Sequence, residues 1–313
     1  MKNFRPGSAR SLRTVKNLAV LYALLALAAF ELACGGGASS PMQTPVPASQ
    51  LTFNHVVLIV EENHSYSDVI GNSAMPYFNS LASQYGLATQ YFAVAHPSLP
   101  NYLALTTGLT ETFDDNFSGT ISDDNVVREL VKAGKSWKAY LESIPSPGYL
   151  GGDSGTYLRH HNPFTYLSDV QSDNSQAANI VPFTQFAIDL GNSALPQYSF
   201  IAPDVMDDAH DGTLAQADAW LQANISPLIS NPSFQSSGLL IITFDEGDQS
   251  DSDHGGGHVA TVIISSQAKN GYQSQTLYQH PSTLRLILAG SGVDNFPGMA
   301  ATAPDMTEFF NGH

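Results

Sequence analysis

Short apolar runs separated by polar motifs are the dominant pattern along this chain. Val56–Val60, Leu239–Phe244 and Val259–Ser265 are rich in β-branched and aliphatic residues, and Ser199–Ala202 is a fourth, shorter run. Runs of this length predict strands that are buried on both faces of a sheet.

Helical patterns lie between and after these runs. In the longest of them, apolar residues recur at spacings of three and four, at Leu214, Ala217, Leu221, Ile225 and Leu228. Further helices are predicted over Pro281–Leu288 and Ala303–Phe310, and another begins just after His96–Tyr102. The alternation of strands and helices predicts an α/β fold with a mostly parallel central sheet and helices on both faces.

The charge of the chain restricts the ligands that it could bind. The sequence has 12 basic and 28 acidic residues, and the net charge is −16. Without the segment that ends at Cys34, seven basic and 27 acidic residues would remain, giving −20. A protein with this net negative charge repels nucleic acids and anionic membrane surfaces, so we expect no nucleic-acid partner. A phosphate-bearing substrate would need a locally positive site, which a metal ion could supply.

The N-terminal residues are typical of an export signal. Basic residues precede the apolar run Leu18–Phe30, and the only cysteine follows in Glu31–Gly35. This last segment resembles a bacterial lipobox, in which Cys34 is lipidated after cleavage. A plainly cleaved signal and an uncleaved anchor are the alternatives, and all three place the body outside the cytoplasm.

We therefore expect three regions along the chain. Residues 1–34 form a signal or lipoprotein anchor, and residues 35–50, rich in Gly, Ser, Pro and Ala, form a flexible linker. Residues 51–313 form the functional domain. A membrane partner is expected only through the lipid anchor.

Polar clusters follow three of the four predicted strands. They are Glu61–Tyr66, Pro203–Asp211 and Asp245–His258. In open parallel sheets the functional residues lie at the carboxyl ends of the strands. Adjacent carboxylates at such an end are costly unless a metal or a proton neutralises them, although a solvated acidic loop is the alternative for each cluster.

Two further clusters lie between the strands. In His96–Tyr102, two prolines stiffen a turn around Ser98 at the start of a helix, which suits a nucleophile close to free backbone N–H groups. A plain helix cap is the alternative. Tyr157–Pro163 carries Arg159, His160 and His161, which could contact a phosphoryl oxygen or a leaving group, or could form a surface turn.

In combination, these motifs resemble the acid phosphatase/phospholipase C family of phosphoesterases. The likeness spans residues 54–310 in the right order, through ENHSY, HPSLPNYLALTTG, RHHNPF, DDAHDG, TFDEGD and the closing Tyr278…Arg285 segment. The nearer branch is the small acid phosphatases. The resemblance implies an alkaline-phosphatase-like α/β fold and one divalent metal ion, which could be Ca, Mg, Mn, Zn or Fe.

The resemblance also implies roles for individual residues. Metal ligands would be Glu62, Asn63, Ser98, Asp245 and Glu246. Ser98 would also be the nucleophile, with His161, His210 and Asp211 as further catalytic residues. Substrate contacts would come from His96, Asn101, Asn162 and His258. One departure is Glu246, because the phospholipase branch usually has a second aspartate at that position.

The expected reaction is hydrolysis of a small phosphate ester through a phosphoserine intermediate. Ser98 would attack phosphorus, and His210 or His161 would protonate the leaving alcohol. A phospholipase C-type phosphodiesterase is an alternative substrate class. A sulfatase is disfavoured, because Ser98–Tyr102 matches S-x-P but lacks the arginine of the sulfatase motif. A surface binding lipoprotein with a degenerate site is the alternative without catalysis.

Overall fold

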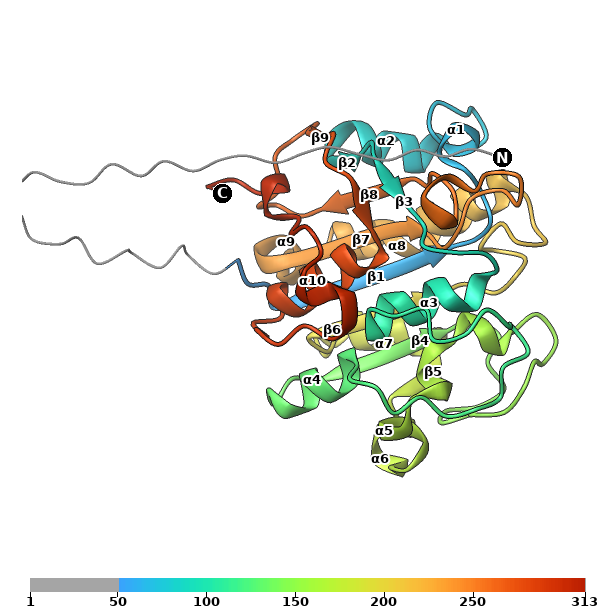
Figure 1. The fold of residues 1–313 in the computed structure, drawn as a ribbon. Coiled ribbons are helices and arrows are strands. Elements are labelled where there is room, and N and C mark those ends of the chain that lie inside the picture. The colour runs from blue at the N-terminus through green and yellow to red at the C-terminus, as the bar shows by residue number, and fades with distance from the viewer. Residues whose placement is uncertain (1–50, 313) are drawn as a thin grey trace, which may run out of the picture. The chain divides into compact units, whose positions relative to one another are not determined.

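The computed structural model describes residues 51–312, which contain an eight-stranded sheet with the strand order β5-β4-β6-β1-β7-β8-β2-β9 (Figure 1). A separate two-stranded ribbon pairs β10 with β3. The strands are β1 His55–Glu61, β2 Gly86–Ala88, β3 Tyr91–Phe92, β4 Trp137–Leu141, β5 Ile180–Pro182, β6 Tyr198–Ala202, β7 Gly238–Phe244, β8 Thr261–Ile264, β9 Gln273–Ser274 and β10 Tyr278–Gln279.

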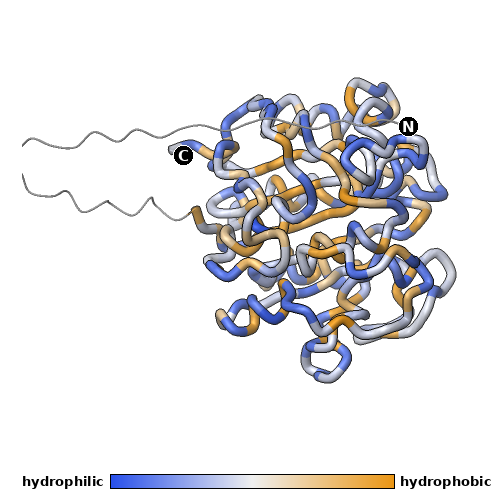
Figure 2. Tube along the Cα trace, viewed as in Figure 1, coloured by the Kyte–Doolittle hydropathy of each residue, from blue (hydrophilic) through white to orange (hydrophobic). Residues whose placement is uncertain are grey.

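The central strand β1 is buried along nearly its whole length. It lies between β6 and β7 and is parallel to both, with Glu61 opposite Phe244 at its carboxyl end. All residues of Val56–Val60 are fully buried, as their continuous apolar character predicts for a strand covered on both faces. Figure 2 shows the same strands as an apolar centre surrounded by more polar loops.

One side of the sheet departs from the parallel arrangement. β8 is antiparallel to both β7 and β2, whereas β5, β4, β6, β1 and β7 form a continuous parallel block. The mostly parallel sheet predicted from the sequence is therefore confirmed. The parallel block matters for function, since the carboxyl ends of its strands meet at one edge.

Helices cover both faces of the sheet, as predicted (Figure 1). α3, α4 and α10 contact one another on one face, and α8 contacts both α2 and α9 on the other. The helices are α1 Tyr66–Val69, α2 Pro76–Gln84, α3 Ser98–Thr107, α4 Val126–Lys132, α5 Ser168–Gln171, α6 Asn174–Ala177, α7 Thr184–Gly191, α8 Leu214–Ile229, α9 Pro232–Ser237 and α10 His280–Gly290. Short 3₁₀ turns cover Arg159–His161, Pro163–Tyr166, Asp253–Gly255, Gly298–Ala301 and Thr307–Phe309.

The four predicted strands and three of the predicted helices are present. The helix predicted over Ala303–Phe310 is wrong, because only the 3₁₀ turn Thr307–Phe309 forms in that range. Pro304 disfavours helical backbone at Ala303 and supplies no N–H of its own, so the apolar spacing does not become a helix. The expected anchor and linker, residues 1–50, lie outside the described residues.

Within residues 51–312, no helix is long and apolar enough to cross a lipid bilayer.

A carboxylate on α8 caps the start of α2. Asp218 is 4% exposed and accepts hydrogen bonds from the N–H groups of Tyr77 and Phe78, at 2.9 and 2.8 Å. α2 has no capping side chain of its own, so this contact between helices replaces one. It satisfies two backbone donors that would otherwise lack a partner at the helix start.

We expect Asp218→Ala to lower the free energy of unfolding by about 2–3 kcal/mol, because two poorly solvated N–H groups lose their acceptor. Asp218→Asn should lose less, since its amide oxygen can still accept one of the bonds. Urea unfolding followed by circular dichroism measures both. Equal stability of the alanine variant and the wild-type protein would refute the capping role.

Candidate active site

Two carboxylates meet where β1 and β7 end. Glu62 directly follows β1 and Asp245 directly follows β7, and the parallel register places these two positions side by side. The Asp245 N–H donates to the Glu61 carbonyl at 2.9 Å, and the Asn63 N–H donates to Asp245 Oδ1 at 3.1 Å. Glu62, Asn63 and Asp245, predicted to share one ion, are therefore adjacent.

The loop after β6 adds a third acid to this edge. The Glu62 N–H donates to the Asp208 carbonyl at 2.8 Å. His161 lies between the two acids, with Nε2 3.3 Å from Glu62 Oε1 and Nδ1 3.2 Å from Asp208 Oδ2. Asp208 belongs to the predicted acidic cluster, but the motif singled out Asp211 there, and spacing does not distinguish Asp208 from Asp204 or Asp207.

Ser98 joins this group from the first turn of α3. It is 4% exposed, and its Oγ donates to Glu62 Oε2 at 3.2 Å. One turn later Tyr102 donates a short hydrogen bond to the other Glu62 oxygen, and the Tyr102 ring stacks on His161 with 5.3 Å between centroids. Both Glu62 oxygens thus accept hydrogen bonds from side chains of α3, the helix that carries Ser98.

Glu246 points its Oε2 toward His96. His96 Nδ1 lies 2.8 Å from that oxygen, while Nε2 donates to the Asp251 carbonyl at 2.8 Å. Because a carbonyl can only accept, Nε2 is the nitrogen that donates to Asp251. Both ring nitrogens of His96 have partners within the protein, and its role in substrate binding stays a prediction.

The acids at this edge are buried, and their basic neighbours are histidines. Burial raises the pKa of Asp208 to about 8 and that of Asp245 to about 6. Burial and the neighbouring Asp245 raise the pKa of Glu246 to about 9. No Lys or Arg of residues 51–312 forms an ion pair with Glu62 or with any of these three acids.

The unpartnered oxygens fit a cation. Asn63 Oδ1 and Asp245 Oδ2 are buried, and neither has a hydrogen-bond donor within the described residues. A hard divalent ion takes carboxylate and amide oxygens of this kind. Glu62, His161 and Asp208 also place one ligand atom each within 4.8 Å of one another, so they form an overlapping set around Glu62.

Glu61 is a buried acid that the sequence did not single out. It is 0% exposed, and both carboxylate oxygens lack a donor among residues 51–312. Burial, followed by Asp208 and Asp207, raises its pKa well above the usual range. Side chains alternate along a strand, so Glu61 points to the opposite face from Glu62.

His210 and Asp211 lie at the more open side of the site. The His210 ring is 5.7 Å from that of His161, and its Nδ1 lies 2.9 Å from Asp211 Oδ1. The His210 side chain is 30% exposed, against 3% for His161. Asn162 donates to the Tyr157 hydroxyl at 3.0 Å, and its buried Oδ1 has no donor among the residues that the structure describes.

Two residues predicted to contact substrate, Asn101 and His258, hydrogen-bond to the surrounding backbone, and their contact with substrate stays a prediction. Asn101 Oδ1 accepts from the N–H groups of Val94 and Ala95, and Nδ2 donates to the carbonyls of Ala95 and Pro97. His258 hydrogen-bonds to the Thr89 carbonyl at 3.0 Å, and its ring stacks on Tyr66. Their polar atoms are used inside the protein, because loop backbone near the site needs partners.

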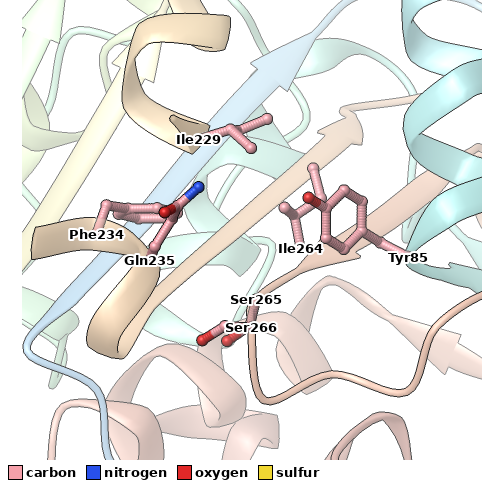
Figure 3. A pocket seen from close by; sticks show the side chains of 7 residues that line it. All are labelled: Tyr85, Ile229, Phe234, Gln235, Ile264, Ser265 and Ser266. Carbon is pink, nitrogen blue, oxygen red and sulfur yellow. The ribbon is translucent and has the colours of Figure 1, made fainter. Parts of the chain in front are cut away.

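A hollow of about 240 Å³ lies elsewhere, lined by Tyr85, Ile229, Phe234, Gln235, Ile264, Ser265 and Ser266 (Figure 3). Phe234 belongs to α9, which leads into the amino end of β7. The hollow is thus at the opposite end of β7 from Asp245. It contains no carboxylate or imidazole, so we place the chemistry at the carboxyl edge.

Comparison with known proteins identifies relatives of this chain. A family model described as the Phosphoesterase family matches residues 72–294. The chain is 36% identical over 275 residues to a phosphatidylinositol-3-phosphatase of Mycobacterium tuberculosis, covering 86% of this chain and 87% of that protein. It is 33% identical over 272 residues to an acid phosphatase of Aspergillus fumigatus, covering 82% of this chain but only 59% of that protein.

A solved structure supports the fold class. A protein of the alkaline phosphatase superfamily from Vibrio parahaemolyticus matches with a TM-score of 0.57 at 12% identity, covering 84% of this chain and 73% of that one. The alkaline-phosphatase-like fold implied by the sequence motifs is confirmed.

The contacts of Asn101 give a test of its role. We expect Asn101→Ala to lower the free energy of unfolding by about 2–4 kcal/mol, since buried backbone donors and acceptors lose their partners. Thermal unfolding and the KM for a phosphate ester, measured together, check this. A raised KM with unchanged stability would instead support substrate contact by Asn101.

Proposed function

This chain belongs to the phosphoesterase family, a family of hydrolases that act on phosphoric esters, and from that premise we propose a metal-dependent phosphatase with Ser98 as nucleophile. The observation that carries the proposal is the hydrogen bond from Ser98 Oγ to Glu62 Oε2 at the start of α3. A hydroxyl held there faces a buried acidic centre and lies at the positive end of a helix, where an anion is favoured.

The first step forms a bond between Ser98 Oγ and phosphorus and breaks the bond to the leaving alcohol. Glu62 Oε2 orients the hydroxyl and receives its proton through the existing hydrogen bond. The Ser98 N–H, which has no acceptor among residues 51–312, is free to donate to a phosphoryl oxygen. Water then attacks the phosphoserine from the vacated side and restores Ser98.

His210 is the better candidate for the acid that protonates the leaving alcohol. Its side chain is the more exposed of the two histidines, and Asp211 holds the ring through Nδ1. That contact leaves Nε2 to face the substrate. His161, enclosed by Glu62 and Asp208, would instead hold these acids in place.

Glu62, Asn63 and Asp245 would hold the divalent ion, with Ser98 and Glu246 completing the set that the family motif implies. When bound, the ion would offset the charges of these acids and of the phosphate group and would make the Ser98 hydroxyl more acidic. Oxygen ligands favour Ca²⁺, Mg²⁺ or Mn²⁺, whereas participation of His161 would favour zinc or iron.

The proposed substrate is a small phosphate monoester outside the cytoplasm. The relatives named phosphatidylinositol-3-phosphatase and acid phosphatase support a monoester. The low content of basic residues disfavours nucleic acids. Export, and lipidation at Cys34, rest on the sequence pattern of residues 1–34.

We expect Ser98→Ala to lower kcat by about 10³-fold or more, because the nucleophile is lost and only binding and electrostatic effects remain. The fold should persist, and acid quenching of the wild-type reaction should trap phosphate on the peptide that contains Ser98. Ser282→Ala is the matched control, since Ser282 is a buried serine on α10 whose hydroxyl has no partner in the described chain. Near-normal turnover by Ser98→Ala would contradict a mechanism with Ser98 as nucleophile.

We expect chelation to abolish activity and Asp245→Asn to reduce the bound metal, because one oxygen ligand becomes a neutral amide. Metal analysis of purified protein measures this directly. Asp189→Asn is the control. Asp189 lies on α7 and pairs with Lys138 of β4, so this variant should leave the metal content unchanged. Full activity of metal-free protein would contradict the assignment.

A further inference from the structure

The first turn of α3 has few backbone donors to offer. Pro97, which precedes the helix, gives it no capping side chain, and Pro100 has no N–H. The Ser98 N–H has no acceptor among residues 51–312. The Leu99 N–H donates to Asp115 Oδ1 at 2.9 Å. A distant carboxylate therefore caps the helix that carries the nucleophile.

Asp115 belongs to the irregular segment 109–120, between α3 and α4. This segment is attached to the part of the chain that contains His161 and Asn162. The Phe117 ring lies 5.8 Å from that of Tyr166, and the Ile121 N–H donates to the Tyr166 carbonyl at 2.8 Å. Tyr166 ends the 3₁₀ turn that begins directly after Asn162. The stretch of chain around Asp115 thus contacts both α3, through Leu99, and the turn that follows Asn162, through Tyr166.

Of the N–H groups of Ser98 and Leu99, Asp115 accepts only from that of Leu99. Because Asp115 accepts from the Leu99 N–H, the first turn is held while the N–H of Ser98 has no acceptor among residues 51–312. Helix capping by a carboxylate is stabilising at this end of a helix, and it restricts how the first turn can rotate. A small displacement of the turn would move Ser98 Oγ away from Glu62 Oε2.

We propose that Asp115 is a positioning residue, which holds the first turn of α3 so that Ser98 Oγ stays on Glu62 and the Ser98 N–H stays free for the phosphoryl oxygen. The inference rests on the proposed function of Ser98. Asp115 acts through Leu99 and the helix start, not through contact with the substrate.

Asp115 also carries a charge near the site. Together with burial and Asp245, it raises the pKa of Glu246. An effect of Asp115 on catalysis could therefore come from its charge or from its hydrogen bond. Two conservative variants separate these causes. Asp115→Asn keeps a hydrogen-bond acceptor on a side chain of the same length but loses the charge. Asp115→Glu keeps the charge, but its longer side chain displaces the acceptor.

The test is steady-state hydrolysis of p-nitrophenyl phosphate by the metal-loaded protein. We expect Asp115→Ala to lower kcat by on the order of 10²-fold with KM changed less than about threefold, because misplacement of a reacting group mainly affects the chemical step. Asp115→Asn should retain at least about a third of kcat, since Asn is an effective helix cap. Asp115→Glu should fall below the asparagine variant.

Asp218→Ala is the matched control for stability. It removes a comparable carboxylate cap from α2, outside the catalytic residues, so its thermal midpoint should fall while kcat stays at the wild-type value. Loss of kcat in both alanine variants in proportion to their loss of stability would overturn the positioning role. If Asp115→Ala does not fold, the asparagine and glutamate variants still decide between hydrogen bond and charge.

Ser98→Ala, assayed in parallel, separates this inference from the function that it rests on. An inactive Ser98→Ala with a fully active Asp115→Ala would overturn the role of Asp115 alone. A fully active Ser98→Ala would overturn both. Higher activity in Asp115→Glu than in Asp115→Asn would assign the effect to charge and would likewise overturn the proposal.

Discussion

The concentration of buried acids at the carboxyl ends of β1, β6 and β7 is the constraint on which the site depends. Glu62, Asp208 and Asp245 lie close together because their strands are neighbours in a parallel sheet, and no Lys or Arg of residues 51–312 pairs with them. Buried like charges are tolerated only where protons or cations offset them. The buried and largely apolar strands β1, β6 and β7 supply the packing that holds the acids in spite of this cost.

Sequence patterns predicted the parallel core well because its strands are continuous apolar runs. β4 was missed, since Lys138 interrupts Trp137–Leu141 and the run is short. The helix over Ala303–Phe310 was wrong because apolar spacing cannot overcome Pro304. Strands of two or three residues, such as β9, carry too few positions for any periodic signal to appear.

The residues of the site were predictable where they directly follow a strand or start a helix. Glu62, Asp245 and Ser98 are of this kind, and the structure brings them together. Sequence spacing does not predict which residue of a loop reaches the site. Asp208 stands among four aspartates in eight residues, and only the path of the backbone after β6 selects it. Asn101 lies in the same motif as Ser98, yet its amide is used by the turn itself.

The pairing of β1 with β7 determines which parts of this chain can change length during evolution. Glu61 ends β1 and Glu62 directly follows it, so a single-residue deletion within β1 would move the acid that contacts Ser98 to the position that Glu61 now holds. A change of length in β1 would therefore misplace the acids of the site. Segments such as 109–120 are anchored at only a few points, and they can diversify around an unchanged reactive centre.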